Sequence, residues 1–258
     1  FACVPPVANV LLESNTVIDV GQYSTLTAGA TGGTPSYNFK WFSQSGCGGT
    51  SFASGITTTV HPSSTTIYTF KVTDSNGNFD CSASNTITVN PVIQITAKPS
   101  TPVTMHIGQS IPVNAVASGG TGSFTYGYTS VGCGGLSGST NSLTFTPTSA
   151  ESCTFTFSAN DIYTSNTAST ATITVNPVIQ VTAKPSTPVT MNVSQSIPVN
   201  AVASGGTGSF TYSYTSTCTG YPSGSGNTLT FTPNAVQSCA FTFSANDIYT
   251  SNTASTAT

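Results

Sequence analysis

The chain has 258 residues, a net charge of −3 and only 4% charged residues, against about 25% in an ordinary soluble domain. It contains four lysines and no arginine, which excludes the basic surface typical of nucleic-acid-binding proteins. No run of about 18 apolar residues occurs, so the sequence offers no candidate membrane-spanning helix. A surface this poor in charge must be solvated by hydroxyl and amide groups, and we interpret the chain as an extracellular or cell-surface protein.

Two long segments of the sequence each occur twice. SIPVNAVASGGTGSFTY at residues 110–126 returns at 196–212, and FTFSANDIYTSNTASTAT at 155–172 returns at 241–258, a shift of 86 residues in both cases. A diverged copy comes first, because GGTPSYNFKW matches GGTGSFTYGY and YTFKVTDSN matches FTFSANDIY. Repeats of this kind indicate tandem domains. We place three domains at residues 1–90, 91–176 and 177–258.

Within each copy, the sequence predicts strands where aromatic or β-branched residues alternate with small polar ones. The first copy has two such runs, Tyr37, Phe39 and Trp41, and then Tyr68, Phe70 and Val72. The second copy has four, which are Ile111, Val113, Ala115 and Ala117, then Phe124, Tyr126 and Tyr128, then Phe155, Phe157 and Ala159, then Ile173 and Val175. Gly-Gly, Asn-Gly and proline separate the runs, as turn formers do. We therefore expect an all-β chain of three tandem immunoglobulin-like β-sandwich domains, each with about seven short strands.

The junctions between copies are short. VNPVIQ occurs at residues 89–94 and again at 175–180. Each junction holds one proline and no flexible Gly/Ser run, so the last strand of one copy runs almost directly into the first strand of the next. This pattern predicts a semi-rigid rod of domains.

The cysteines fall in pairs within the copies, with one left over. The seven are Cys3, Cys47, Cys81, Cys133, Cys153, Cys218 and Cys239. Paired cysteines in a charge-poor chain indicate an oxidising compartment. In the second and third copies a disulfide would join the loop after the third strand to the start of the sixth, which gives Cys133–Cys153 and Cys218–Cys239. In the first copy we favour Cys47–Cys81, which leaves Cys3 over, and the alternative pairs Cys3 with Cys81.

The first copy also carries a resemblance to known modules. GGTPSYNFKW followed by VTDSNGNFDCSASNTITV resembles the PKD-like and gliding-adhesin-type immunoglobulin repeats of prokaryotic surface proteins, and is similar to repeats of archaeal surface-layer and extracellular filament proteins. Trp41 continues as FSQSGC in place of the Asp-Phe-Gly-Asp-Gly-like run of PKD modules, and Tyr128 and Tyr214 stand where the later copies would carry the Trp. The resemblance implies an extracellular β-sandwich array used for structure, spacing or adhesion.

No group of residues predicts catalysis, so we expect neither an enzyme nor a cofactor. His61 precedes a proline in a predicted loop, and the position of His106 is taken by Asn192 in the third copy. We interpret both histidines as surface or turn residues.

Acidic residues recur at one place in the repeats. Asp74, Asp161 and Asp247 each follow the sixth predicted strand, where a short acidic side chain can shape the next turn. The run DSNGNFD is also a weak calcium candidate, because oxygen ligands at alternate positions are typical of calcium loops. Its ligands would be Asp74, Asn76, Asn78 and Asp80. The Asn-Gly pair inside it is equally a hairpin turn signal.

Two features raise the question of glycans. The tyrosine pairs of the second and third copies could stack on sugars, although alternate spacing is also typical of residues that face a sheet core. These pairs are Tyr126 with Tyr128 and Tyr212 with Tyr214. Asn192 begins the only N-glycosylation sequon, Asn-Val-Ser. Surface glycans are therefore a candidate ligand class, and Asn192 is a candidate glycosylation site.

The two ends of the sequence fall at the same phase of the repeat. FACVPPVAN aligns with TITVNPVIQ, which places Val4 on Val175 and Pro6 on Pro177, whereas Thr258 matches Thr172, just before Ile173. We therefore expect the last domain to lack its final strand and a strand of another copy to complete it. The expected donor residues are Phe1, Ala2, Cys3, Val4, Pro5, Pro6 and Val7. The expected acceptor residues are Phe241 and Phe243.

Head-to-tail contacts that do not close produce filaments. The sequence therefore favours a structural subunit of an extracellular, pilus-like filament whose partners are other copies of itself. It leaves open a segment of a cell-surface or S-layer repeat protein, or an adhesin that binds carbohydrate.

Overall fold

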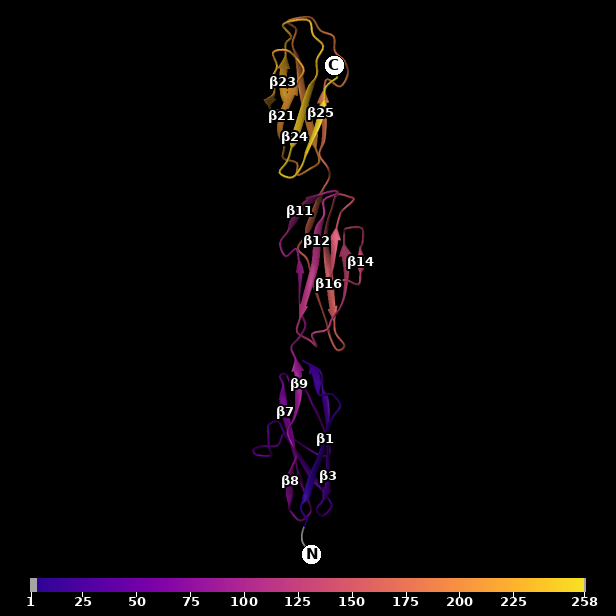
Figure 1. Cartoon of the computed structure of the whole chain (residues 1–258), viewed down its shortest axis with the longest axis vertical. Coiled ribbons are helices and arrows are strands. Elements are labelled where there is room, and N and C mark those ends of the chain that lie inside the picture. Colours follow the sequence, from indigo (N-terminus) through magenta and orange to yellow (C-terminus); the bar gives the residue numbers. More distant parts are fainter. Residues whose placement is uncertain (1–3, 258) are drawn as a thin grey trace. The chain divides into compact units, whose positions relative to one another are not determined.

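The computed structural model describes residues 4–257, and every regular element within them is a β-strand. The all-β class expected from the sequence is confirmed. The chain divides into two compact units. The first is Phe1–Thr96 with Ala115–Gly127 and Phe157–Ala168, and the second is Ala97–Asn114 with Tyr128–Thr156 and Ser169–Thr258. Figure 1 shows the strands coloured along the sequence.

In the first unit, residues 6–90 form a sandwich of two sheets. One sheet has the strand order β1-β3-β6, and the other has the order β2-β9-β7-β4-β5 with β8 beside β7. Neighbouring strands are antiparallel except for β2 and β9, which run parallel. The strands are β1 (Pro6–Glu13), β2 (Val17–Asp19), β3 (Ser24–Gly32), β4 (Asn38–Phe42), β5 (Ala53–Ser54), β6 (Thr57–Val60), β7 (Thr66–Thr73), β8 (Phe79–Cys81) and β9 (Asn85–Asn90).

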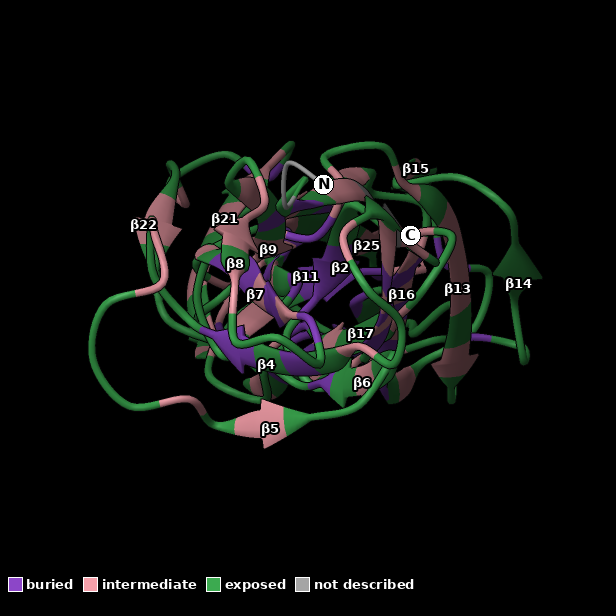
Figure 2. Ribbon diagram, turned by 90° about the horizontal axis from the view of Figure 1, so that it is seen from below, coloured by how far each residue is buried: buried purple, intermediate pink, exposed green. Residues whose placement is uncertain are grey.

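The core of this sandwich follows the alternation of the sequence. Trp41, Phe70 and Ile87 are fully buried and belong to one cluster, as expected when successive side chains of a strand point to opposite faces. The indole nitrogen of Trp41 donates a hydrogen bond of 2.8 Å to the carbonyl of Gly55. Figure 2 shows the buried positions on β4 and β7 and none on the short edge strand β5.

The second repeat, residues 91–176, contributes a sheet of order β10-β12-β15 and a sheet of order β11-β18-β16-β13-β14 in which β17 pairs with β16. Its strands are β10 (Gln94–Lys98), β11 (Val103–His106), β12 (Ile111–Ser118), β13 (Thr125–Val131), β14 (Ser137–Gly138), β15 (Ser142–Phe145), β16 (Glu151–Asn160), β17 (Ser165–Ser169) and β18 (Ile173–Asn176). This is the same arrangement as in the first sandwich, with the parallel pair β11 and β18 in the place of β2 and β9.

The third repeat, residues 177–258, forms a sheet of order β19-β20-β23 and a smaller sheet of order β22-β21-β24-β25. Its strands are β19 (Gln180–Lys184), β20 (Ile197–Ser204), β21 (Thr211–Ser216), β22 (Gly224–Ser225), β23 (Thr228–Phe231), β24 (Phe241–Asn246) and β25 (Ser251–Ser255). Within the described residues this repeat has no counterpart of β11 or of β18. The second sheet therefore lacks the parallel pair that the other two repeats share.

Each repeat holds one internal disulfide. The bonds join Cys47 to Cys81, Cys133 to Cys153 and Cys218 to Cys239. These are the pairs named from the sequence, and Cys3 lies outside the described residues. In the third repeat, Cys218 lies in the core cluster and Cys239 packs against it.

Candidate strand-binding site

In the second repeat, β18 fills the space between two other strands. It runs parallel to β11, with Val103 opposite Ile173, and antiparallel to β16, with Cys153 opposite the same Ile173. The side chains of Ile173 and Val175 point inward and are buried. The last strand is thus paired on both edges, with β11 and with β16, and contributes two β-branched side chains to the core.

The matching edges of the third repeat are open. Residues 189–192 correspond to β11 but form no strand, and residues 237–239 correspond to the start of β16 but precede β24. Met105 in β11 is buried, whereas its counterpart Met191 is only partly buried. The exposure of Met191 indicates that the core of the third repeat is incompletely covered at this edge.

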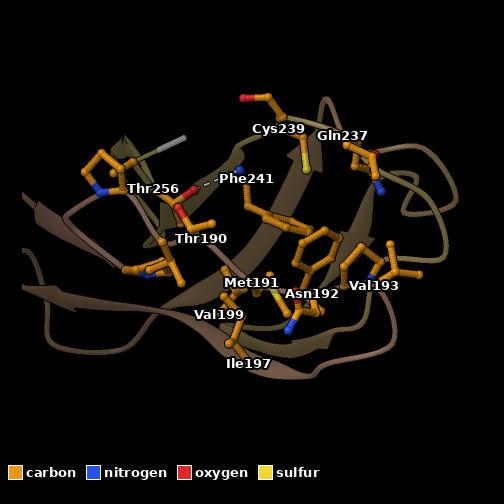
Figure 3. Close-up of a pocket in the computed structure, with 18 of the residues that line it drawn as sticks. Thr190, Met191, Asn192, Val193, Ile197, Val199, Gln237, Cys239, Phe241 and Thr256 are labelled. Carbon is orange, nitrogen blue, oxygen red and sulfur yellow. Dashed lines mark hydrogen bonds between the residues drawn. The ribbon is translucent and has the colours of Figure 1, made fainter.

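An open groove of about 480 Å³ lies between these two edges. Its apolar lining includes Met191, Val199, Phe231, Phe241 and Ala257, and none of the described side chains that border it is charged. Figure 3 shows the side chains of Met191 and Phe241 directed into the same space. The groove thus lies along the line that β18 occupies in the second repeat, over core residues of which Val199, Phe231 and Phe241 stay buried and Met191 is partly exposed.

The turn beside the groove keeps one backbone hydrogen bond of the filled repeat. In the second repeat, the N–H of Gly108 donates to the carbonyl of Pro147, and the N–H of Ile107 donates to the carbonyl of Asn176 in β18. In the third repeat the first of these bonds is kept, from the N–H of Ser194 to the carbonyl of Pro233 at 2.9 Å. The second bond has no counterpart among the described residues, because none of them takes the place of Asn176.

Gln237 is a polar side chain at the groove whose amide is only partly hydrogen-bonded. Its Oε1 accepts a hydrogen bond of 2.8 Å from the N–H of Thr219. Its Nε2 is buried and has no hydrogen-bond partner among the described residues. An unpaired buried donor is costly, by about 1–3 kcal/mol, and a carbonyl that entered the groove could relieve this cost.

The expected acceptor residues need a correction. Phe243 lies opposite Ala254 of β25, and both backbone groups of Phe241 bond to Thr256. Neither residue therefore has a free edge, although the ring of Phe241 lines the groove. The free edge is the preceding stretch, residues 237–239, because their counterparts in the second repeat are the residues that pair with β18.

The expected donor segment also needs a correction. Pro6 and Val7 belong to β1, where they lie opposite Gly32 and Thr31, so they are already paired within the first sandwich. Of the other donor residues, Val4 and Pro5 precede β1 and are exposed, and Phe1, Ala2 and Cys3 lie outside the described residues.

The alignment behind that donor prediction is shifted by two residues. Val7 faces Thr31, just before Gly32-Gly33, as Gln180 faces Ser204, just before Gly205-Gly206. Val7 is thus the counterpart of Gln180. Pro6 then takes the place of Ile179 and Val4 that of Pro177. The earlier alignment was wrong because it matched Pro6 to Pro177, the one proline of the later junction.

The weak calcium candidate does not form a convergent ligand set. One carboxylate oxygen of Asp74 accepts the backbone N–H groups of Asn76 and Asn78, at 2.9 Å each. A carboxylate oxygen of Asp80 instead accepts the N–H of Ala8 in β1. The described residues contain no cluster of three or more His, Cys, Asp or Glu side chains suited to a metal ion. The loop is built as a turn in which Asp74 is the acceptor.

The recurring aspartates play the same part in the later repeats. Asp161 accepts N–H groups of Thr164, Thr121 and Tyr163. Burial alone would raise the pKa of Asp161, but these hydrogen bonds outweigh it and lower the pKa to about 2. Asp247 accepts the corresponding N–H groups of the third repeat, and its pKa is likewise lowered to about 2. These carboxylates hold the turns together in charged form.

The histidines differ from each other. His61 is exposed, as expected, but the surface interpretation of His106 is wrong, because His106 is buried. Within the second unit, its Nε2 lies 3.4 Å from a carboxylate oxygen of Asp247. His106 is the last residue of β11, and its ring is covered by residues of the third repeat, because its Nδ1 lies 3.3 Å from the carbonyl oxygen of Pro177 and its ring centroid lies 5.6 Å from that of Tyr249. A comparison of residue types between copies could not reveal these contacts.

The tyrosine pairs take part in the packing of the sheets. The hydroxyls of Tyr126 and Tyr212 accept the N–H groups of Ala117 and Ala203, at 3.2 and 3.0 Å. Tyr214 packs at a tilt on Phe243, with ring centroids 5.8 Å apart. These contacts favour the structural interpretation of the stripes over sugar stacking. Asn192 is exposed at the rim of the groove, and its glycosylation stays a prediction.

Comparisons with known proteins define the fold. No protein-family model and no curated protein matches the chain. Among solved structures it is similar to the I-band fragment I67–I69 of titin, with a TM-score of 0.58 and 16% identity over 99% of this chain and 98% of that one. The fold is that of tandem immunoglobulin-like domains. The three N-terminal domains of the outer capsid protein Hoc of bacteriophage RB49 match with a TM-score of 0.46 and 13% identity over 97% of each chain.

No helix of the described part could cross a membrane. The three disulfides are typical of proteins that fold in an oxidising compartment outside the cytosol.

Proposed function

We propose that the chain is a structural subunit of an extracellular filament whose copies join head to tail. The observation that carries this proposal is the open groove of the third repeat, at the place where β18 completes the second. An open sheet edge is a template for an added strand. A strand from one copy that enters the groove of the next makes a heterologous contact, which propagates when it does not close.

The segment ahead of β1 is the proposed donor. At both junctions within the chain, three residues separate the last strand of one repeat from the first strand of the next, Pro91–Ile93 and Pro177–Ile179. With Val7 as the counterpart of Gln180, the same spacing makes Val4, Pro5 and Pro6 the junction and would end a donor strand at Cys3. The corrected alignment thus narrows the donor to the stretch that ends at residue 3, with Ala2 in the place of Val175.

A segment of a longer cell-surface repeat protein is the second candidate. It is favoured by the two junctions just described, because in both of them the completing strand comes from the same chain. In that case the strand for the groove would follow Thr258 directly. The groove needs a strand in both cases, and the two candidates differ in its source.

Assembly of the purified chain tests the first candidate. We expect filaments in electron micrographs of the 26.2 kDa chain, and monomers from a chain extended after Thr258 by Ile-Thr-Val-Asn, because the added strand fills the groove. Denaturing gels of the native material should then show a subunit of this mass. A chain that stays monomeric at high concentration, together with a much longer native polypeptide, would overturn the filament and support the surface repeat protein.

A further inference from the structure

We infer that the contact between the second and third repeats depends on pH, and that it forms when the imidazole of His106 is positively charged and is released when the ring loses this charge as the pH rises. The inference goes beyond the proposed function, because it concerns two repeats of one chain and holds with or without filaments. It rests on the groups that face the ring, on the burial of the contact and on the residue that the first repeat has at the same position.

Both ring nitrogens of His106 face oxygen acceptors of the third repeat within the second unit. Nδ1 lies 3.3 Å from the carbonyl oxygen of Pro177, and Nε2 lies 3.4 Å from a carboxylate oxygen of Asp247. A neutral imidazole carries one N–H group, whereas the protonated ring carries two. In the neutral ring, one nitrogen therefore directs a lone pair at an oxygen, and only the charged ring can donate to both acceptors.

The contact between the ring and the carboxylate is buried. The side chains of His106 and Asp247 are 1% and 0% exposed, and Nε2 has no hydrogen-bond partner among the described residues. A buried polar atom without a partner is costly. The charged ring makes the same contact an ion pair, and burial reduces its screening by salt. Protonation of the ring thus favours the contact twice, because it removes a lone pair and adds a Coulombic attraction.

Asp247 is the charged group that faces the ring. Burial alone would raise the pKa of Asp247, but hydrogen bonds from three backbone N–H groups and the charge of His106 lower the pKa to about 2. The carboxylate is therefore ionised wherever an imidazole titrates. Tyr249 is the other titratable side chain against the ring, and a phenol stays neutral over this range. β18, the turn at residues 107–110 and the junction at residues 177–179 contribute no charged side chain.

The first repeat has an aspartate at the same position. Asp19 ends β2 as His106 ends β11, and the backbone N–H of each donates to the side chain of a glutamine three residues later. Within the first unit, a carboxylate oxygen of Asp19 accepts the hydroxyl of Thr164 at 2.8 Å. Thr164 belongs to the turn of Asp161 in the second repeat. A carboxylate accepts such a bond without taking up a proton, so the first contact should not respond to pH over the range in which an imidazole titrates.

Magnetic resonance relaxation of the backbone amides tests the inference, because it gives a tumbling time for each repeat in the monomeric fraction of the full chain. At about pH 5 the second and third repeats should share one tumbling time, and at about pH 8 the third repeat should lose it and tumble faster. The variant His106→Gln cannot take up a proton, so its third repeat should tumble separately at both pH values. The variant His61→Gln removes the other histidine, which is exposed, and should respond to pH like the parent.

A second variant, His106→Asp, gives this contact the residue of the first one. Its carboxylate can accept the hydroxyl of Thr250, which is the counterpart of Thr164, so the two repeats should share a tumbling time at both pH values. A shared tumbling time of the parent at both pH values, or an unchanged pH response in either variant of His106, would overturn the inference. Separate tumbling of the parent at the lower pH, with amide spectra that show folded repeats, would overturn it as well.

Discussion

The backbone N–H of Phe241 donates a hydrogen bond of 3.0 Å to the hydroxyl of Thr256, and the N–H of Thr256 returns one of 2.9 Å to the carbonyl of Phe241. Phe155 and Thr170 form the same reciprocal pair in the second repeat, at 3.1 and 2.9 Å. In the third repeat, this pair bonds both backbone groups of Phe241, the first residue of β24. The groove therefore begins only before Phe241, and its free edge is short.

Replacement of Thr256 should destabilise the third repeat. Thr256→Val keeps the shape of the side chain but leaves the buried N–H of Phe241 without an acceptor, so we expect the free energy of unfolding to fall by about 1–3 kcal/mol. Thr253→Val, at an exposed position of the preceding strand β25 (Ser251–Ser255), should change it by less than about 0.5 kcal/mol. Urea unfolding measures both, and equal effects would contradict the role given to the Thr256 hydroxyl.

The acid stability of the chain should depend on Asp161 and Asp247. Both carboxyls have a pKa lowered to about 2 in the folded chain, against about 3.9 for an unperturbed aspartate. The stability that they contribute is present above pH about 4 and is lost as the pH falls towards about 2. The urea midpoint should therefore decline over this range, and Asp161→Asn with Asp247→Asn should flatten the decline. An unchanged pH profile in the double variant would show that other groups are responsible.

Gly206 should tolerate no side chain. Its φ is +53°, and an added Cβ would lie 2.5 Å from a carboxylate oxygen of Asp247 and 2.9 Å from the Ile179 side chain. Gly206→Ala should therefore lower the free energy of unfolding by more than about 2 kcal/mol. Gly208 is the matched control, because its φ is +82° and an added Cβ would meet no atom within 4 Å. Gly208→Ala should cost about 1–2 kcal/mol for the backbone alone, and equal losses would argue against the contact with Asp247.

Removal of the third disulfide should affect both stability and the groove. Cys218 and Cys239 are 21 residues apart, so their joint replacement by alanine should cost about 3 kcal/mol. Because Cys239 also borders the groove, assembly of the chain should weaken. Joint replacement of Cys133 and Cys153, which are 20 residues apart, should cost a similar amount and leave assembly intact. If both replacements weaken assembly equally, the third disulfide does not shape the groove.

The alternation of residue types was sufficient to predict much of the fold. The run Phe155, Phe157 and Ala159 became one buried face of β16, because a strand sends every second side chain to the same side. The absence of a counterpart of β18 from the described residues of the third repeat could also be predicted, since Thr172 leads directly into Ile173 in the second copy and Thr258 is the counterpart of Thr172.

The errors arose where tertiary contacts, which a single sequence does not encode locally, decide the outcome. The position of β1 in the repeat is set by its pairing with β3, where Pro6 lies opposite Gly32. An alignment that matched Pro6 to Pro177 could not reveal this pairing. The free edge is at residues 237–239 and not at Phe241, because the N–H of Phe241 already donates to the hydroxyl of Thr256. The burial of His106 involves contacts of its ring with Asp247 and Tyr249, which lie far from it in the sequence.

The parallel pairing of β11 with β18 determines how a repeat would respond to force. Tension applied at the two ends of the second repeat would pull the start of β11 and the end of β18 in opposite directions. In a parallel pair this motion slides one strand along the other, so that the pairs from Val103–Ile173 to His106–Asn176 are loaded together and not in succession. The third repeat lacks this clamp while its groove is open. It should therefore yield first under load, and it should become as strong as its neighbours once a strand is bound.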